Sequence, residues 1–401
     1  MARRIRANRS SPFEIFAIFL KLGLTSFGGP VAHLGYFRAE FVGKRQWLDE
    51  SAYADLVALC QFLPGPTSSE FGIAVGLLRA GLPGALAAWI GFTLPSALLM
   101  AGFGYGMAQL GDLSHAAWLH GLKLVALAVV AQAVWNMARS LAPDAQRALL
   151  ALAAAIVALT LPVVWGQLGA IVLGALIGWR YLQSRPRPAS KHLRPRVSHA
   201  VSAGALILFF ALLVILPLAA ARGGTGWQLF DGFYRSGALV FGGGHVLLPL
   251  LDAVVVPHGW VGQNTFLAGY GAAQALPGPL FAFAAYLGMA MNVTPGGWQG
   301  AGLALAAIFL PGFLLVVGTL RLWGKLRANQ KAQATLAGVN AAVVGLLLAA
   351  LYNPIFVNSV FDAGDFAFAL GAFALLQFTK APPWAVVILG AVAAQILAFI
   401  G

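Results

Sequence analysis

Charged residues are scarce in this chain. Only 9% of its 401 residues are charged, whereas 60% are hydrophobic. A soluble domain of this composition could not cover its surface with polar groups, so we interpret the chain as an integral membrane protein lying in a lipid bilayer. The formal net charge of +13 does not indicate nucleic acid, because Arg and Lys are confined to short connections, where they report topology.

Cysteine and the familiar catalytic motifs are also rare or absent. Cys60 is the only cysteine, which excludes an intramolecular disulfide and a cysteine-based metal site. There is no GxxxxGK[ST] loop for ATP-driven transport and no HExxH or GxSxG sequence of a hydrolase. No four His or carboxylate side chains are expected to converge. We therefore expect no metal, no cofactor and no enzyme activity.

The basic residues predict the topology. Four arginines lie within residues 3–9, and residues 180–196 hold six basic residues and three prolines. Both segments are expected to be cytoplasmic, so an even number of crossings separates them. Before the connector we expect full spans at about 82–110, 113–138, 146–161 and 164–181. After it we expect one extra span at about 199–221, then spans at about 297–321, 332–352, 362–379 and 383–400. This order places the C-terminus on the periplasmic side.

Two helix-breaking motifs occur in both halves. Phe27–Pro30 (FGGP) and Gln61–Pro66 (QFLPGP) recur as Phe241–Gly244 (FGGG) and Gln274–Pro279 (QALPGP), at offsets of 214 and 213 residues. The flanking arms of about 12–16 residues cover roughly 18–24 Å as helices, less than the ~30 Å hydrocarbon core. We therefore expect re-entrant hairpins or broken helices, which in paired halves mark a transporter site.

The charges exchange sides between the halves. Arg38, Lys44 and Arg45 correspond to residues 252–258, which contain no Lys or Arg. Conversely, a basic cluster at 321–331 corresponds to the first-half segment 111–115, which has none. The predicted fold is therefore an all-α polytopic membrane protein with two inverted-topology repeats joined by one extra transmembrane helix. We assign residues 1–182 and 228–401 to the repeats and 183–227 to the linker and connecting helix.

The breaks are the first set of candidate site residues. A helix that starts anew inside the membrane presents unpaired N–H groups and a positive dipole end, which suit an anion. The amides of Gln61 and Gln274 either bond an oxyanion or satisfy freed carbonyls. The alternative is that the breaks are kinks that merely pack closely. The candidate substrate residues from the breaks are Phe27, Gly28, Gly29, Gln61, Pro64, Gly65, Pro66, Thr67, Ser68, Ser69, Gly242, Gly243, Gln274, Pro277, Gly278 and Pro279.

Charged residues in the arms form the second set. Lys21 and Arg235 stand 214 residues apart, six residues before each Phe, and two such cations suit a dianion; the alternative is snorkelling to the interface. Glu70 follows the first PGP break, and its counterpart is Phe283. It either carries a coupled proton, forms an ion pair with Lys21 or Lys123, or serves as a first-turn carboxylate.

These residues resemble a known family. Phe27–Pro30, Arg38 with Glu40–Val42, Trp47–Asp49 and Gln61–Pro66, echoed by Phe241–Gly244, Trp260 and Gln274–Pro279, resemble the chromate ion transporter (CHR) family in its long-chain form with two fused CHR domains. The resemblance implies a secondary active antiporter of the bacterial inner membrane that exports chromate, driven by the proton-motive force, with sulfate as a related dianion.

One departure from the pattern concerns symmetry. Gly244 stands where the first half has Pro30, and the second arm begins with apolar Leu280 and Phe281. We therefore expect two unequal half-sites and a binding site near the centre, biased toward the first repeat. Uptake or exchange of sulfate or another oxyanion is the alternative function, and a membrane-embedded enzyme or a structural scaffold is the alternative of a different class. A homodimer, and rocking versus elevator movement, are left open.

Overall fold

The computed structural model describes residues 10–109, 116–183, 197–379 and 381–400. Within these ranges all regular structure is helical and there is no strand. Five of the described helices are long and apolar enough to cross a membrane. The prediction of an all-α polytopic membrane protein is confirmed. The N-terminal arginines and residues 184–196 of the connector lie outside the described residues, as do Gly111 to His115.

The helices fall close to the predicted spans. In the first half and the connecting helix they are α1 (Pro12–Thr25), α2 (Gly29–Arg38), the π-helix η1 (Ala39–Lys44), α3 (Glu50–Phe62), α4 (Thr67–Gln109), α5 (Ala117–Leu141), α6 (Ala145–Thr160), α7 (Val163–Tyr181) and α8 (His199–Arg222). In the second half they are α9 (Thr225–Leu239), η2 (Gly244–Val246), α10 (Leu247–Val255), α11 (Gln263–Ala273), η3 (Leu280–Ala282), α12 (Phe283–Ala290), α13 (Gly297–Thr319), α14 (Trp323–Ala328), α15 (Gln330–Ala350), the π-helix η4 (Leu351–Phe356), α16 (Ala363–Phe378) and α17 (Pro383–Ile400).

Both predicted motifs interrupt helices in both halves. Helix α1 ends at Thr25 and α2 starts at Gly29, after Gly28 with φ +96°. Helix α3 ends at Phe62 and α4 starts at Thr67, as expected. In the second half α9 ends at Leu239 and α11 at Ala273, before the corresponding glycines. Glycine has no Cβ, so it reaches this left-handed backbone region without strain.

The arm after the first PGP motif and the next span are almost continuous. Together they form α4, whose backbone leaves the helical region at Ala80 and at Gly81, where φ is +67°, close to the predicted start of the span at about 82. The two arms then turn back on each other, with Gly76 packed directly against Gly84. In the second half α12 and α13 make the same kind of approach at Gly288 and Gly300. Small residues at these points let the backbones approach closely.

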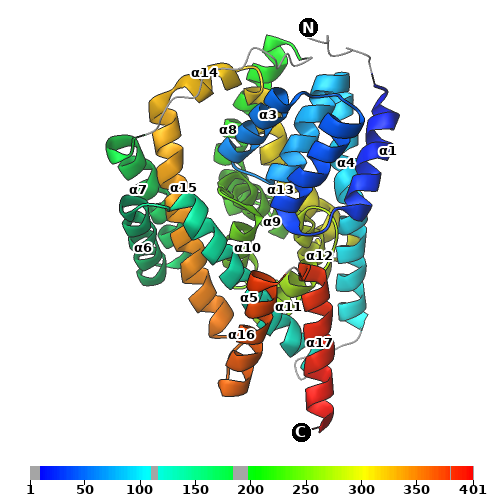
Figure 1. Cartoon of the computed structure of the whole chain (residues 1–401), viewed down its shortest axis with the longest axis vertical. Helices are drawn as coiled ribbons and strands as arrows, with labels where there is room; N and C mark the ends of the chain where they lie inside the picture. The colour runs from blue at the N-terminus through cyan, green and yellow to red at the C-terminus, as the bar shows by residue number, and fades with distance from the viewer. Residues whose placement is uncertain (1–9, 110–115, 184–196, 380, 401) are drawn as a thin grey trace.

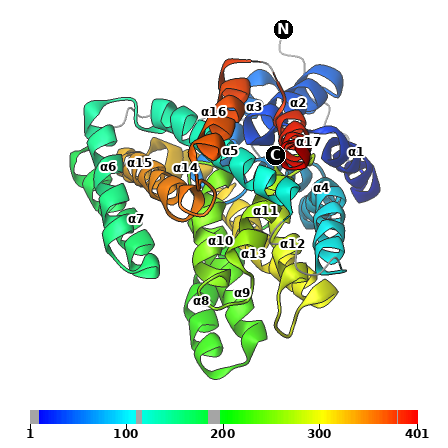
Figure 2. The same ribbon diagram turned by 90° about the horizontal axis from the view of Figure 1, so that it is seen from below.

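The outer helices are exchanged between the halves. Helices α6 and α7 of the first half pack on α15 of the second, whereas α16 and α17 of the second pack on α5 of the first. Figure 2 shows α6 and α7 together on the flank of α15. Glycines mark both contacts: Gly174 lies against Gly338, and Gly121 against Gly390. The two halves therefore interlock and do not form separate bodies.

Along the long axis the two ends of the chain lie apart. Helices α1 and α3 occupy the upper part of Figure 1 with α14, whereas α16 and α17 occupy the lower part. Helix α8 presents large exposed apolar side chains, such as Ile207, Phe210 and Val214. An apolar helix with so much exposed surface is suited to face lipid.

Candidate functional site

The helix breaks of one half bond to those of the other. The Gly278 N–H donates to the carbonyl oxygen of Ser26 at 2.9 Å, and the Gly65 N–H donates to that of Val240 at 2.8 Å. Each bond joins an FGG break to the PGP break of the opposite half. We call the contact of Ser26–Pro30 with Pro277–Pro279 the first crossing, and that of Val240–Gly244 with Pro64–Pro66 the second crossing. Both satisfy backbone groups that the breaks leave unpaired.

A cavity of about 90 Å³ lies at the first crossing. Four predicted site residues line it: Gly28, Gly29, Gln274 and Gly278. Two helix N-termini lie at this cavity, because α2 begins at Gly29 and η3, which leads into α12, begins at Leu280, and both residues line it. The first N–H groups of a helix have no partner within it, and the dipole makes this end positive. The cavity thus has the donors that a small anion requires.

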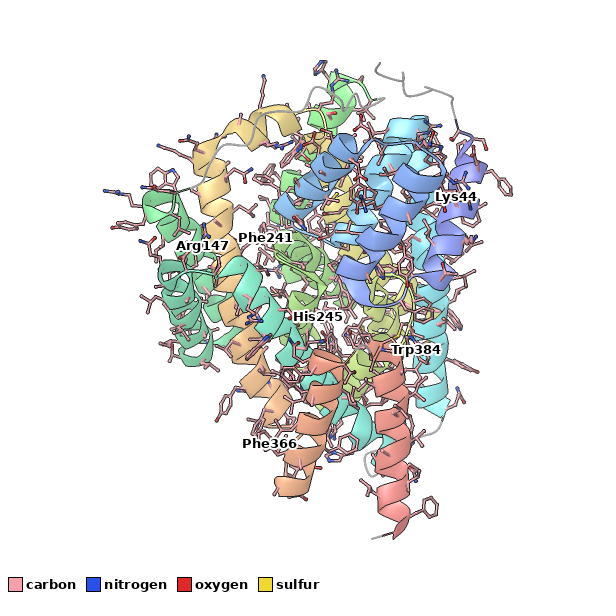
Figure 3. The ribbon with its side chains drawn as sticks, in the orientation of Figure 1. Lys44, Arg147, Phe241, His245, Phe366 and Trp384 are labelled. Carbon is pink, nitrogen blue, oxygen red and sulfur yellow. The ribbon has the colours of Figure 1, made fainter. Side chains whose placement is uncertain are left out.

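Three polar side chains complete the lining. His245 Nδ1 is 2.9 Å from the Tyr270 hydroxyl, which fixes the ring. The Nε2 atom of Gln274 is buried and makes no hydrogen bond of normal geometry among the described residues, and its amide lies beside the Tyr270 hydroxyl. Gln132 Nε2 donates to the carbonyl oxygen of Leu376 at 2.6 Å. Figure 3 shows His245 near mid-height, and Trp384, whose ring lies 6.2 Å from that of Phe27, at a similar level.

Two of these polar residues were not among the predicted site residues. His245 follows the second FGG break, but it was not predicted to belong to the site. Gln132 is the one amide in the otherwise apolar middle of α5, and that isolation is a sequence signal that could have found it. Among the residues that the structure describes, no Lys or Arg lines the cavity.

The second crossing is filled by packed side chains. Leu141 and Met137 of α5 lie against Gly242, so that a Cβ there would collide with Leu141. Glu70 is fully buried, and its carboxyl packs against the backbone of Gly65 and Gly312. Neither of its carboxyl oxygens has a hydrogen-bond partner among the described residues. Because an unpaired buried charge is costly, these surroundings suit the neutral acid.

The alternative ion pairs for Glu70 are not formed in this arrangement. Lys21 is exposed on α1, and Lys123 Nζ instead donates to Asn264 Oδ1 at 3.1 Å and to the Asn358 carbonyl oxygen at 3.3 Å. The alternative in which Glu70 forms an ion pair with Lys21 or Lys123 is therefore wrong for this structure. Thr67, Ser68 and Ser69 start α4 as expected, but they do not line the cavity, and their contact with substrate stays a prediction.

Lys21 and Arg235 differ in their surroundings despite their matching positions. Arg235 forms an ion pair with Asp231, one turn earlier on α9, whose side chain is only 3% exposed. Asp231 has no carboxylate counterpart on α1, where Ala17 stands. Neither cation lines the cavity at the first crossing. A direct contact of either with substrate stays a prediction, as it does for Gln61, which is exposed at the end of α3.

The chromate transporter family model matches residues 13–179 and again residues 227–395. The chain belongs to the chromate transporter family. Its two matches confirm the long-chain form with two fused domains, one on each side of α8.

Similar proteins include two chromate transport proteins. The one from Pseudomonas aeruginosa is 31% identical over 343 residues, which cover 83% of this chain and 79% of that protein. The one from Cupriavidus metallidurans is 28% identical over 406 residues, covering 96% of this chain and 93% of that protein. No solved structure matches this chain. Because the chain belongs to the chromate transporter family, we expect the cavity at the first crossing, which suits an anion, to be its most important functional site.

Proposed function

We propose that this protein is a secondary active antiporter that exports chromate across the bacterial inner membrane, driven by the proton-motive force. The cavity at the first crossing carries the proposal. It is small, it lies between the N-termini of α2 and η3, and it is lined by His245 and the buried amide of Gln274. Membership of the chromate transporter family names the oxyanion that these donors would bind.

The donors in the cavity suit a dianion that must bind and leave again. Backbone N–H groups and neutral side chains stabilise an oxyanion through oriented dipoles. A directly paired Lys or Arg would hold the dianion more tightly and slow its release. Sulfate has the same shape and charge as chromate, so we expect it to compete for the same groups.

Glu70 is the proposed proton carrier. It is buried at the second crossing against Gly65, whose N–H bonds to Val240. Releasing its proton would place a charge against the PGP break and favour a rearrangement that exposes the carboxylate to water. The proposal thus couples the protonation of Glu70 to movement at the break.

The proposed architecture is two inverted repeats, residues 1–182 and 228–401, joined by residues 183–227. Support comes from paired contacts: Ser26 with Gly278 and Val240 with Gly65, and the exchange of α6–α7 and α16–α17 between the halves. A two-fold axis in the membrane plane would relate these contacts. The N-terminus would be cytoplasmic and the C-terminus periplasmic, in line with the separation of α1 and α17 in Figure 1. A homodimer stays a prediction.

The test is radiolabelled chromate flux in everted membrane vesicles containing the protein. We expect chromate to enter these vesicles, to enter faster when their interior is acidified, and to be slowed by sulfate. Vesicles without the protein are the control. Sulfate flux without chromate movement would replace the proposal by sulfate transport, and chromate flux that ignores the pH gradient would remove proton coupling.

A further inference from the structure

A second and larger cavity, of about 320 Å³, lies away from both crossings. It is formed where α6 ends and α7 begins, beside the end of α10 and the junction of α15 with η4. Under the proposed topology this is the periplasmic end of α15. Its polar lining side chains are Gln167, Asp252, Gln263, Asn353 and Asn358.

Three of the lining amides have a fixed orientation. Gln263 Nε2 donates to Asp252 Oδ1 at 2.9 Å, Gln167 Nε2 donates to the Pro249 carbonyl oxygen at 2.8 Å, and Asn358 Nδ2 donates to the Pro354 carbonyl oxygen at 2.7 Å. Each partner is a carboxylate or a carbonyl, which can only accept. The amide nitrogen must therefore face the partner with one N–H, and the side-chain oxygen and the second N–H are left for a ligand.

The cavity consequently offers acceptors. Four side-chain oxygens have no protein donor among the described residues: those of Gln167, Gln263 and Asn358, and the second carboxylate oxygen of Asp252. The Asp252 carboxylate, which is the one charged side chain among the described lining residues, repels an oxyanion. Oxygen ligands with a single negative charge suit a hard cation that keeps part of its hydration shell.

Two neighbouring features bear on which kind of cation the cavity could bind. Among the described residues no three His, Cys, Asp or Glu side chains gather to hold a metal ion, which argues against a tightly bound transition metal. The ammonium group of Lys123 bonds to the backbone oxygen of Asn358, but Lys123 does not line the cavity. Its ammonium group lies over the Phe361 ring and beside Asn264.

We propose that this cavity is a binding site for a partly hydrated alkali-metal cation, with Asp252 supplying the charge and the three amide oxygens completing the ligand set. The site does not depend on the chromate proposal, because it shares no lining residue with the cavity at the first crossing. A bound cation at this end would tie α6, α7, α10 and η4 together.

The experiment uses purified full-length protein in lipid nanodiscs at constant ionic strength, with NaCl, KCl or N-methylglucamine chloride. We expect Na⁺ or K⁺ to raise Tm by roughly 2–5 °C over N-methylglucamine, because a ligand that binds only the folded state stabilises it. Equilibrium binding of radiolabelled Na⁺, competed by K⁺, gives a second readout that does not depend on unfolding.

Asp252→Asn removes the charge while keeping an acceptor for Gln263, and it should abolish both the Tm shift and Na⁺ binding. Asn358→Leu should weaken both, which keeps the test decisive if the first variant folds poorly. Asp144→Asn, an exposed carboxylate paired with Arg147 on the α5–α6 connection, is the matched control and should behave as the native protein. A cation effect that persists in Asp252→Asn, or no effect in the native protein, overturns the proposal.

Discussion

The two crossings are joined by the same kind of backbone hydrogen bond, but a cavity lies at the first and packed side chains fill the second. At the first crossing a Cβ added to Gly29 would meet nothing within 4 Å, and a cavity is present. At the second, a Cβ added to the corresponding Gly243 would meet Met137 Sδ, and its neighbour Gly242 is covered by Leu141. The first has the side-chain donors of Gln274 and His245, whereas the second buries the carboxyl of Glu70.

This difference indicates a division of tasks between equivalent places. Neutral donors and helix N-termini suit an oxyanion, whereas a buried carboxyl suits a proton. If both crossings had the same contents, anion and proton would compete for equivalent sites. Under the proposed function, unequal crossings instead give each ligand its own break, and α5 contacts both breaks.

The largest expected effect comes from breaking either crossing at its glycine. Gly278 and Gly65 have φ of +90° and +142°, where side chains introduce strain of about 1–3 kcal/mol. A Cβ at Gly278 would also meet Ser96 Oγ, and one at Gly65 would meet the Glu70 carboxyl. We expect Gly278→Ala and Gly65→Ala each to abolish chromate flux in everted vesicles and to lower Tm.

Gly302→Ala is the control for this pair, because a Cβ at Gly302 on α13 meets nothing within 4 Å. It should keep both flux and Tm. If Gly278→Ala and Gly65→Ala also keep native flux, the crossings are packing features without a part in transport.

The variant Glu70→Gln tests the proposed role of the second crossing in proton coupling. Glutamine preserves the size of the neutral acid but cannot release a proton. We expect stimulation of chromate flux by an acidic vesicle interior to disappear, while exchange of chromate across the membrane without a gradient continues. Flux measured with and without the gradient checks this, and gradient stimulation in Glu70→Gln at the native level would exclude Glu70 as the proton carrier.

The cations at matching positions should show a smaller and unequal effect on stability. Arg235→Ala leaves the buried Asp231 unpaired, which we expect to destabilise the fold by about 1–3 kcal/mol, less than for a fully buried pair because Arg235 is 43% exposed. Lys21→Ala removes an exposed side chain and should stay within about 0.5 kcal/mol of the native protein. Thermal unfolding in nanodiscs measures both; equal losses would contradict the asymmetry.

The spans and breaks could be predicted because their signals are local. Runs of apolar residues set the spans, and Gly28, Gly65 and Gly278 have positive φ at the predicted breaks. The crossings depend on contacts between residues far apart in the sequence, Ser26 with Gly278 and Gly65 with Val240. No local pattern shows that Pro383 reaches the cavity. The expected bias toward the first repeat rested on Thr67–Glu70, which lie at the other crossing.

The most direct test compares the two equivalent glutamines. Gln274 lines the cavity with its amide nitrogen buried, whereas Gln61 is exposed at the end of α3. The concentration dependence of chromate flux should be measured for Gln274→Ala and Gln61→Ala in the same everted vesicles, at matched protein levels. We predict a raised KM for chromate in Gln274→Ala and a native KM in Gln61→Ala. A native KM in Gln274→Ala, or equal increases in both variants, would contradict chromate binding at the first crossing.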